Sequence, residues 1–281
     1  MEPLRIGFSP CPNDTFMFDA LVHGRVPFSR PVEPVLEDVE ALNARAAGPV
    51  EHRLPVTKLS AAAVLDLAGD VRILDAGAAL GRGCGPLVVT RAGGPSTLTD
   101  LAGRRVAVPG MRTTATLLFE IFGPPAQLVP MRFDRVVKAV AEGTVEAGLL
   151  IHELRFTYEA MGLACVADLG DLWERETGHP LPLGVIAVRR KVPEALATEL
   201  SSGLAASIRR AFADPEAAAP FVAAHAQSMD PDVCRRHIEL YVNAYSERLG
   251  PEGRAALCEL AMRAHAAGRP LAAFEFVPTG G

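Results

Sequence analysis

The sequence predicts an α/β protein of two lobes, with mostly parallel sheets, helices on both faces and a cleft between the lobes. Three observations support this class. Apolar segments of strand length alternate with helical segments along most of the chain, as in parallel α/β sheets. Two strand-like segments, 85–91 and 181–190, lie far apart in the chain and are the expected crossings between lobes. The 281 residues, 49% of them hydrophobic, are enough for two separate cores.

The first part of the chain contains three strand-and-helix units. Their elements are expected at residues 4–9, 14–24, 31–38, 39–48 and 53–69. The first strand ends at the turn PCPND, where Asn13 or Asp14 is expected to cap the following helix. Gly24 is the expected end of that helix, and Ser60 lies where the third helix begins.

The same scheme continues in the middle of the chain, and the C-terminal part is helical and rich in alanine. Strands are expected at residues 85–91, 105–110, 146–152 and 181–190, and helices at 113–123 and 134–143, the latter capped by Asp134. A larger, discontinuous lobe of residues 1–88 plus 186–281 would then enclose a smaller lobe of residues 89–185.

Composition excludes several classes of protein. The net charge of −5 and the scattered arginines do not form a nucleic-acid footprint. No apolar stretch reaches membrane-spanning length, and the N-terminus lacks the features of a signal peptide. The five cysteines are widely spaced without a CxxC pair, and no histidine spacing suggests a metal site. We therefore expect a cytoplasmic protein with reduced thiols and no metal.

Four polar segments follow expected strands, at the edge where parallel sheets bind ligands. They are SPCPNDT (9–15), TKLS (57–60), PGMRTTA (109–115) and IHE (151–153). Helices are expected to begin at Ser60 and at Thr113 or Thr114, and the positive end of a helix favours an anion. Two such helix starts facing the cleft would hold an acidic small molecule, although each alone is an ordinary cap. Lys58 and Arg112 would add positive charge, unless they are solvated surface groups.

His152 is the candidate for chemistry, because it directly follows an apolar strand and should face the cleft. A structural role for it is equally compatible with its position. Glu153 is a weak candidate to orient it, since neighbours on a strand point to opposite faces. Cys11 has no neighbouring histidine in the sequence and is interpreted as a packing residue. His237, in a helical stretch, is interpreted as a surface or packing group.

Several long blocks of the chain together resemble one enzyme family. In order, the blocks are GFSPCPNDTFMFDALVHG, PVTKLS, ALGRGCGPLVV, VAVPGMRTTA and EAGLLIHELRFTY. They are similar to the 1,4-dihydroxy-6-naphthoate synthases of the futalosine route to menaquinone. The likeness extends from the N-terminus to about Arg190 and is looser beyond it. The block SPCPNDTF distinguishes this branch from the chorismate dehydratases of the same route.

The resemblance implies a fold similar to type II periplasmic binding proteins and a cofactor-independent lyase activity. The implied substrate is cyclic dehypoxanthine futalosine, an aromatic carboxylate, which yields 1,4-dihydroxy-6-naphthoate and a dihydroxyacetone fragment. His152 corresponds to the family's proton acceptor. The family's substrate-contacting segments correspond to Lys58, Leu59, Ser60, Thr114 and Ala115. The position of their segments after expected strands adds Ser9, Asn13, Asp14 and Thr113 to the expected substrate-binding residues. Arg112 stands where the family often has a histidine, which leaves any secondary role of that position open.

Two other functions remain open at this stage. The same two-lobed fold could serve a non-catalytic binding or sensing protein for a small carboxylate, because a fold does not fix a function. A related enzyme of the same family could act on another carboxylate. Turnover of the implied substrate separates the synthase from a related enzyme, and saturable binding without product would indicate the binding protein.

Overall fold

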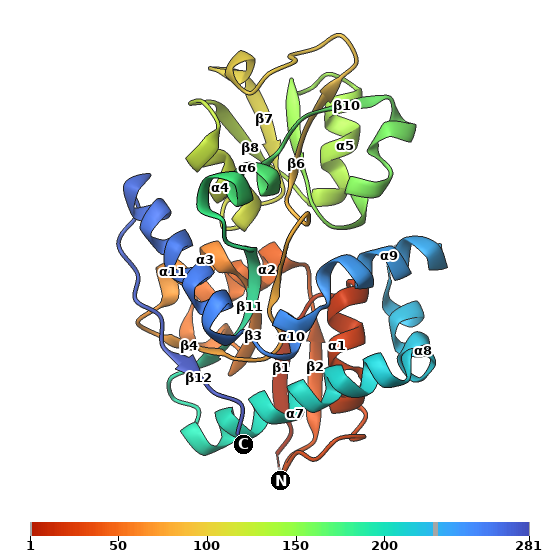
Figure 1. Cartoon of the computed structure of the whole chain (residues 1–281), viewed down its shortest axis with the longest axis vertical. Helices are drawn as coiled ribbons and strands as arrows, with labels where there is room; N and C mark the ends of the chain where they lie inside the picture. Colours follow the sequence, from red (N-terminus) through yellow and green to blue (C-terminus); the bar gives the residue numbers. More distant parts are fainter. Residues whose placement is uncertain (1, 227–229, 281) are drawn as a thin grey trace.

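Two sheets divide the chain into a larger and a smaller lobe in the computed structural model, which describes residues 2–226 and 230–280 (Figure 1). In the described residues the larger sheet has seven strands, in the order β12-β4-β11-β3-β1-β2, with β5 paired to β11. These strands are β1 (Leu4–Phe8), β2 (Val32–Leu36), β3 (Val56–Ser60), β4 (Val71–Leu74), β5 (Ala79–Gly81), β11 (Leu181–Arg189) and β12 (Phe276–Val277).

The smaller lobe contains a sheet that, over the same residues, has five strands in the order β10-β6-β9-β7-β8. Its strands are β6 (Leu87–Arg91), β7 (Arg105–Val108), β8 (Gln127–Pro130), β9 (Ala147–Leu150) and β10 (Leu163–Asp168). The chain enters this lobe between β5 and β6 and leaves it between β10 and β11. The predicted lobe limits, at residues 88/89 and 185/186, fall inside β6 and β11, and a division at these residues stays a prediction.

Both sheets are mixed, and the expectation of mostly parallel sheets is wrong in this respect. Strand β1 runs parallel to β2 and β3, and β7 runs parallel to β8 and β9. The strands that follow the two crossings break the pattern: β11 is antiparallel to β3, β4 and β5, and β6 is antiparallel to β9 and β10. A strand that enters a lobe from the neighbouring lobe can pair in either direction, because no crossover helix sets its direction.

The helices account for most of the remaining described residues. They are α1 (Pro12–Val22), α2 (Val39–Ala47), α3 (Ala61–Leu67), α4 (Thr114–Phe122), α5 (Phe133–Ala141), α6 (Leu169–Thr177), α7 (Glu194–Ala213), α8 (Pro215–His225), α9 (Pro231–Tyr241), α10 (Ala244–Glu247) and α11 (Gly250–Ala266). The helix that was expected to begin at Asp134 begins at Phe133, with Arg132 at its N-cap, so Asp134 lies in its first turn.

Helices cover both faces of the larger sheet, as alternation along β1 shows. Ile6 and Phe8 point into an apolar cluster formed with α1 and α7. Gly7, between them, faces the opposite side, where a Cβ would lie 2.6 Å from Leu54 and 2.9 Å from Leu42 of α2. The central strand is therefore packed between two helical layers, and its C-terminal end is free to carry polar groups.

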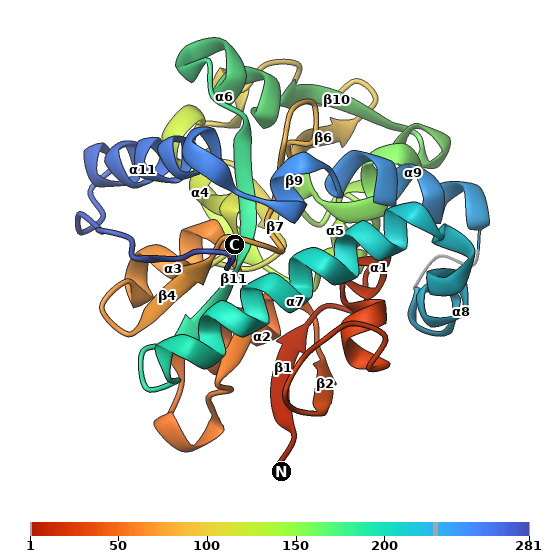
Figure 2. The ribbon, with the colours of Figure 1, turned by 60° about the horizontal axis from the view of Figure 1, so that its bottom comes forward.

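One apolar cluster continues through both lobes. It joins Leu59 and Val64 of the larger lobe to Leu117 and Trp173, which lie on the smaller lobe's helices α4 and α6. The lobes are therefore packed against each other behind the pocket described below. Figure 2 shows α7 crossing the larger lobe and α8 and α9 leading back toward the smaller one, where α9 contacts the segment after β9.

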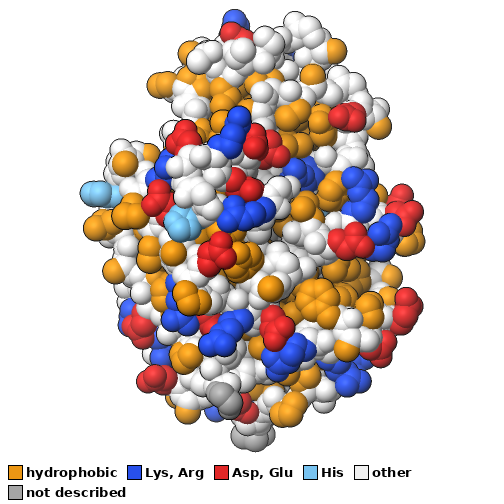
Figure 3. Space-filling model, in the orientation of Figure 1, with side chains coloured by type: hydrophobic (Ala, Val, Ile, Leu, Met, Phe, Trp, Pro, Cys, Tyr) orange, Lys and Arg blue, Asp and Glu red, His pale blue; other side chains and the backbone are white. Residues whose placement is uncertain are grey.

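The surface is mixed in charge. Acidic and basic side chains alternate over the face seen in Figure 3, without a continuous basic stripe on that face. Within residues 2–226 and 230–280, none of the helices combines the length and apolar character that crossing a bilayer requires.

Candidate active site

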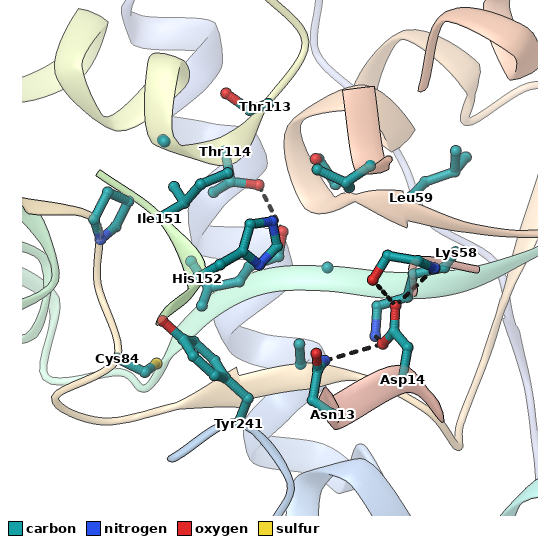
Figure 4. Close-up of a pocket in the computed structure, with 18 of the residues that line it drawn as sticks. Asn13, Asp14, Lys58, Leu59, Cys84, Thr113, Thr114, Ile151, His152 and Tyr241 are labelled. Carbon is teal, nitrogen blue, oxygen red and sulfur yellow. Dashed lines mark hydrogen bonds and ion pairs between the residues drawn. The ribbon is translucent and has the colours of Figure 1, made fainter. Parts of the chain in front are cut away.

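One pocket between the lobes collects the predicted proton acceptor and all the predicted substrate-binding residues (Figure 4). These residues are Ser9, Asn13, Asp14, Lys58, Leu59, Ser60, Thr113, Thr114, Ala115 and His152. They arrive from the carboxyl ends of β1, β3, β7 and β9, as the sequence predicted for an α/β fold. The cavity has a volume of about 90 Å³.

Asp14 organises the floor of the pocket. Its Oδ2 accepts hydrogen bonds from the backbone N and Oγ of Ser9, at 3.1 and 2.7 Å. Its Oδ1 accepts from Asn13 Nδ2 at 3.0 Å and from Lys58 Nζ at 2.9 Å. The expectation that Asn13 or Asp14 caps α1 is wrong, because the helix begins at Pro12 with Cys11 as N-cap. Proline favours this first helical position, which leaves the Asp14 carboxylate free for the ion pair.

Lys58 is buried rather than solvated, with a side chain only 5% exposed. Besides Asp14, its Nζ donates to the carbonyl oxygen of Gly77 at 3.1 Å. An ammonium group has three hydrogens, so one remains for a bound molecule. The alternative that Lys58 is a surface group is therefore wrong, whereas Arg112 is exposed and does not line the pocket.

Ser60 stands at the N-cap of α3, as predicted, but its side chain does not cap that helix. Asn43, fully buried on α2, fixes Ser60 instead. Asn43 Oδ1 accepts from the Ser60 backbone N at 3.0 Å, and Asn43 Nδ2 donates to Ser60 Oγ at 3.0 Å. The turn from β3 into α3 is therefore held rigidly from behind.

Thr113 and Thr114 form the facing helix start in the smaller lobe. Thr113 is the N-cap of α4, and its Oγ1 accepts from the Thr116 backbone N at 3.3 Å. Thr114 Oγ1 donates to the carbonyl oxygen of Leu183 at 2.7 Å and accepts from the backbone N of Ala62 at 3.2 Å. The first amides of α4 lack partners within the helix and therefore remain available to an anion.

A second contact between lobes lies beside this helix start. Glu40 of α2 accepts from the Arg112 backbone N at 3.2 Å and from Asn43 Nδ2 at 3.1 Å. Gly110 has a φ of 146°, and a Cβ there would lie 2.3 Å from Glu40 side-chain carbons. The close approach of the two lobes thus depends on glycine at position 110.

His152 has the most unusual backbone of the site. Its φ of 58° is the one positive value at a non-glycine residue in the described part of the chain. Left-handed backbone at such a residue costs about 1–3 kcal/mol and persists where the surroundings enforce it. The strand ends at Leu150, and residues 152–156 form a 3₁₀ turn. The strand-based argument against Glu153 therefore does not apply, although the structure records no hydrogen bond between Glu153 and His152.

The two ring nitrogens of His152 have different surroundings. Nδ1 lies 3.7 Å from Sγ of Cys11, which comes from the other lobe. Nε2 is buried and has no hydrogen-bond partner among the described residues. Burial raises the pKa of the Cys11 thiol well above its ordinary value, so the sulfur stays protonated and neutral. Cys11 was interpreted as a packing residue without a histidine neighbour, and the fold supplies that neighbour from 141 positions away.

His237 and Tyr241 also line the pocket, and reasoning from the sequence missed both. They lie one turn apart on α9, and both are buried, with His237 only 1% exposed. Of the two interpretations of His237, a surface group or a packing group, burial rules out the surface group. The signal that could have found them is their spacing of four residues on one helical face. Nothing local to α9 indicated that this face meets His152.

Comparisons with known proteins place the chain in a family. A family described as "Menaquinone biosynthesis" matches residues 4–266. The chain is 51% identical to a 1,4-dihydroxy-6-naphtoate synthase of Thermus thermophilus, over 95% of this chain and 96% of that protein. It is 45% identical to the enzyme of the same name from Streptomyces coelicolor, over 95% and 94% of the two chains.

Solved structures resemble it as well. A protein of Archaeoglobus fulgidus, 38% identical, superposes with a TM-score of 0.88 over 95% of this chain and 98% of its own. A Candida albicans protein described as having the generic periplasmic binding protein fold gives a TM-score of 0.69 at 11% identity, over 100% and 99% of the two chains. The predicted fold class, two α/β lobes of the periplasmic-binding-protein type, is confirmed.

Proposed function

The chain belongs to the menaquinone biosynthesis family, and on this premise we propose that its pocket converts cyclic dehypoxanthine futalosine to 1,4-dihydroxy-6-naphthoate and a dihydroxyacetone fragment. It is an enzyme of that pathway, as the synthases of 51% and 45% identity indicate. The observation that carries the assignment is this identity, which extends over nearly the whole of each chain. The pocket supports it by presenting groups that fit both ends of such a substrate.

We propose that the carboxylate of the substrate binds between the two helix starts. The amides that begin α4, at Thr114 and Ala115, point positive partial charge at the pocket. Ser60 faces them from the other lobe. Because Lys58 is already paired with Asp14, it contributes the one ammonium hydrogen that Asp14 and Gly77 leave unused, as a hydrogen-bond donor to the carboxylate, and adds no net charge to the pocket.

We propose that His152 is the proton acceptor, acting through Nε2. For Nε2 to accept a proton, the hydrogen of the neutral ring must sit on Nδ1. Nδ1 then donates to the neutral Cys11 sulfur, a weak acceptor 3.7 Å away. The base removes a proton from a carbon next to a carbonyl, and the released electrons drive carbon–carbon cleavage and formation of the aromatic ring. The orienting role of Cys11 resembles that of the partner on the second nitrogen of many catalytic histidines.

Turnover by the purified chain tests this function directly. The wild type and His152→Asn are mixed with cyclic dehypoxanthine futalosine, and dihydroxynaphthoate is followed by chromatography and mass spectrometry. Loss of a general base lowers rates by roughly 10²–10⁴-fold. Asparagine is the suitable replacement because it tolerates positive φ, so the fold should persist.

The outcomes separate the alternatives. Product from the wild type and a large loss in His152→Asn, with an unchanged urea unfolding curve, support both the activity and the base. Full activity in His152→Asn would remove His152 from that role. Saturable binding without product would instead support the non-catalytic binding protein.

A further inference from the structure

His237 is a buried imidazole to which none of the described residues gives a hydrogen bond. It is 1% exposed, and neither Nδ1 nor Nε2 has a partner among the residues that the structure describes. Nearly all buried polar side-chain atoms in native proteins are hydrogen-bonded, so an exception requires an explanation. His237 lines the same pocket as His152, so a molecule bound in this pocket would lie within reach of its ring.

The ring is held in place by packing alone. Its centroid lies 4.6 Å from the ring of Tyr241 and 6.1 Å from that of His152, with an angle of 25° between the two imidazoles. The guanidinium of Arg236, the preceding residue, lies over Phe156 at 4.5 Å. Because Phe156 ends the turn that begins at His152, this contact ties α9 to the segment carrying the proposed base. The ring is thus fixed while its nitrogens stay free.

We propose that His237 is a substrate-contacting residue, whose neutral imidazole hydrogen bonds an oxygen of the bound substrate next to His152. This inference rests on the function proposed above and adds a residue to its site. A neutral imidazole offers one donor and one acceptor, which suits a hydroxyl or carbonyl oxygen. The carboxylate end of the substrate would bind Lys58 and the start of α4, and the oxygen-bearing end would meet the imidazoles.

The charge state of His237 agrees with such a contact. Burial, with a smaller effect from His152, holds the pKa of His237 well below its ordinary value. His237 therefore remains uncharged next to the proposed base and does not compete for the substrate carboxylate. A purely structural role would be served better by phenylalanine, which packs equally well and buries no unsatisfied nitrogen.

The decisive variant is His237→Phe, assayed for dihydroxynaphthoate formation and for thermal unfolding. We expect kcat/KM to fall by roughly 5- to 150-fold, the range for leaving a buried hydrogen bond unmade, while the melting temperature stays equal or rises. Loss of activity without loss of stability identifies a functional residue. His225→Phe, on α8 outside the pocket, is the matched control and should keep full activity.

Two further variants keep the test decisive if His237→Phe folds poorly. His237→Asn and His237→Gln each retain an amide donor and acceptor, and one of them should recover activity relative to His237→Leu. Full activity in His237→Phe, or equal activity of the Asn, Gln and Leu variants, would overturn the proposal and leave the synthase assignment intact. A wild type that forms no dihydroxynaphthoate would remove the proposed function, and this inference with it.

Discussion

The pocket has two walls that differ in how their polar atoms are satisfied. The bonded wall consists of Asp14, Lys58 and Ser60, with Asn43 behind them, and its side-chain oxygens and amides pair with one another. The imidazole wall consists of His152 and His237, where three of the four ring nitrogens have no partner in the described ranges. In the bonded wall the hydrogen bonds between side chains fix their positions. In the imidazole wall the ring nitrogens without partners are the groups that we propose to bind the ligand.

This difference separates stability from chemistry within one site. A buried polar network that is fully paired rigidifies the fold, whereas unpaired buried groups destabilise it. The protein retains that destabilisation, together with the positive φ of His152, on the wall that carries the proposed proton acceptor. Changes to the bonded wall should therefore affect unfolding most, and changes to the imidazole wall should affect turnover most.

The largest effect on folding is expected from Lys58→Met. Removing one partner of a buried ion pair leaves the Asp14 carboxylate uncompensated, and such losses cost about 3–5 kcal/mol. Urea unfolding measures the change. The double variant Asp14→Asn/Lys58→Met should regain most of the stability, because neither charge remains. A single variant as stable as the wild type would show that the bonded wall does not hold the fold.

A smaller effect is expected from acid on the imidazole wall. Burial lowers the pKa of His237 well below 6.5, so in acid the unfolded chain binds a proton there that the folded chain does not. The free energy of unfolding is therefore unaffected by protonation of His237 above pH 6.5 and decreases as the pH falls below that value, by up to about 1.4 kcal/mol per pH unit. His237→Phe should flatten this dependence, measured as urea unfolding between pH 7.5 and 5. Parallel curves for the two proteins would contradict it.

The smallest effect is expected from Cys11→Ala. A neutral hydrogen bond contributes about 0.5–1.5 kcal/mol, so loss of the sulfur should lower kcat by about 2- to 12-fold. KM should stay constant, because Cys11 does not line the pocket and its proposed role is to orient His152. Cys11→Ser should recover part of kcat, and Cys165→Ala, at an exposed site, should change neither constant. A rise in KM without a change in kcat would assign Cys11 to substrate binding instead.

Local chemistry made part of the molecule predictable. Ser60 and Thr113 were placed at helix starts because a strand followed by a small hydroxyl residue and an apolar run is a local signal. The same reasoning misplaced the start of α1. The helix begins at Pro12, ahead of Asn13 and Asp14, although these two have the better capping side chains. Strand direction at β6 and β11 was missed because pairing between distant segments decides it.

The site was predictable only where it follows strand ends. His152 could be identified as a candidate because it ends a strand-like apolar segment. His237 did not, since its position depends on α9 returning across the pocket after the chain has passed through both lobes. The contact between Cys11 and His152 likewise joins segments from different lobes, and no local pattern encodes it.

The volume of the pocket has a consequence for substrate entry and product release. The cavity measures about 90 Å³, whereas sites for drug-sized ligands measure about 300–1,000 Å³. We therefore expect the lobes to separate when the proposed substrate enters, which would break the contacts that Thr114 and Glu40 make between the lobes. Such an opening step would limit how fast the product can leave.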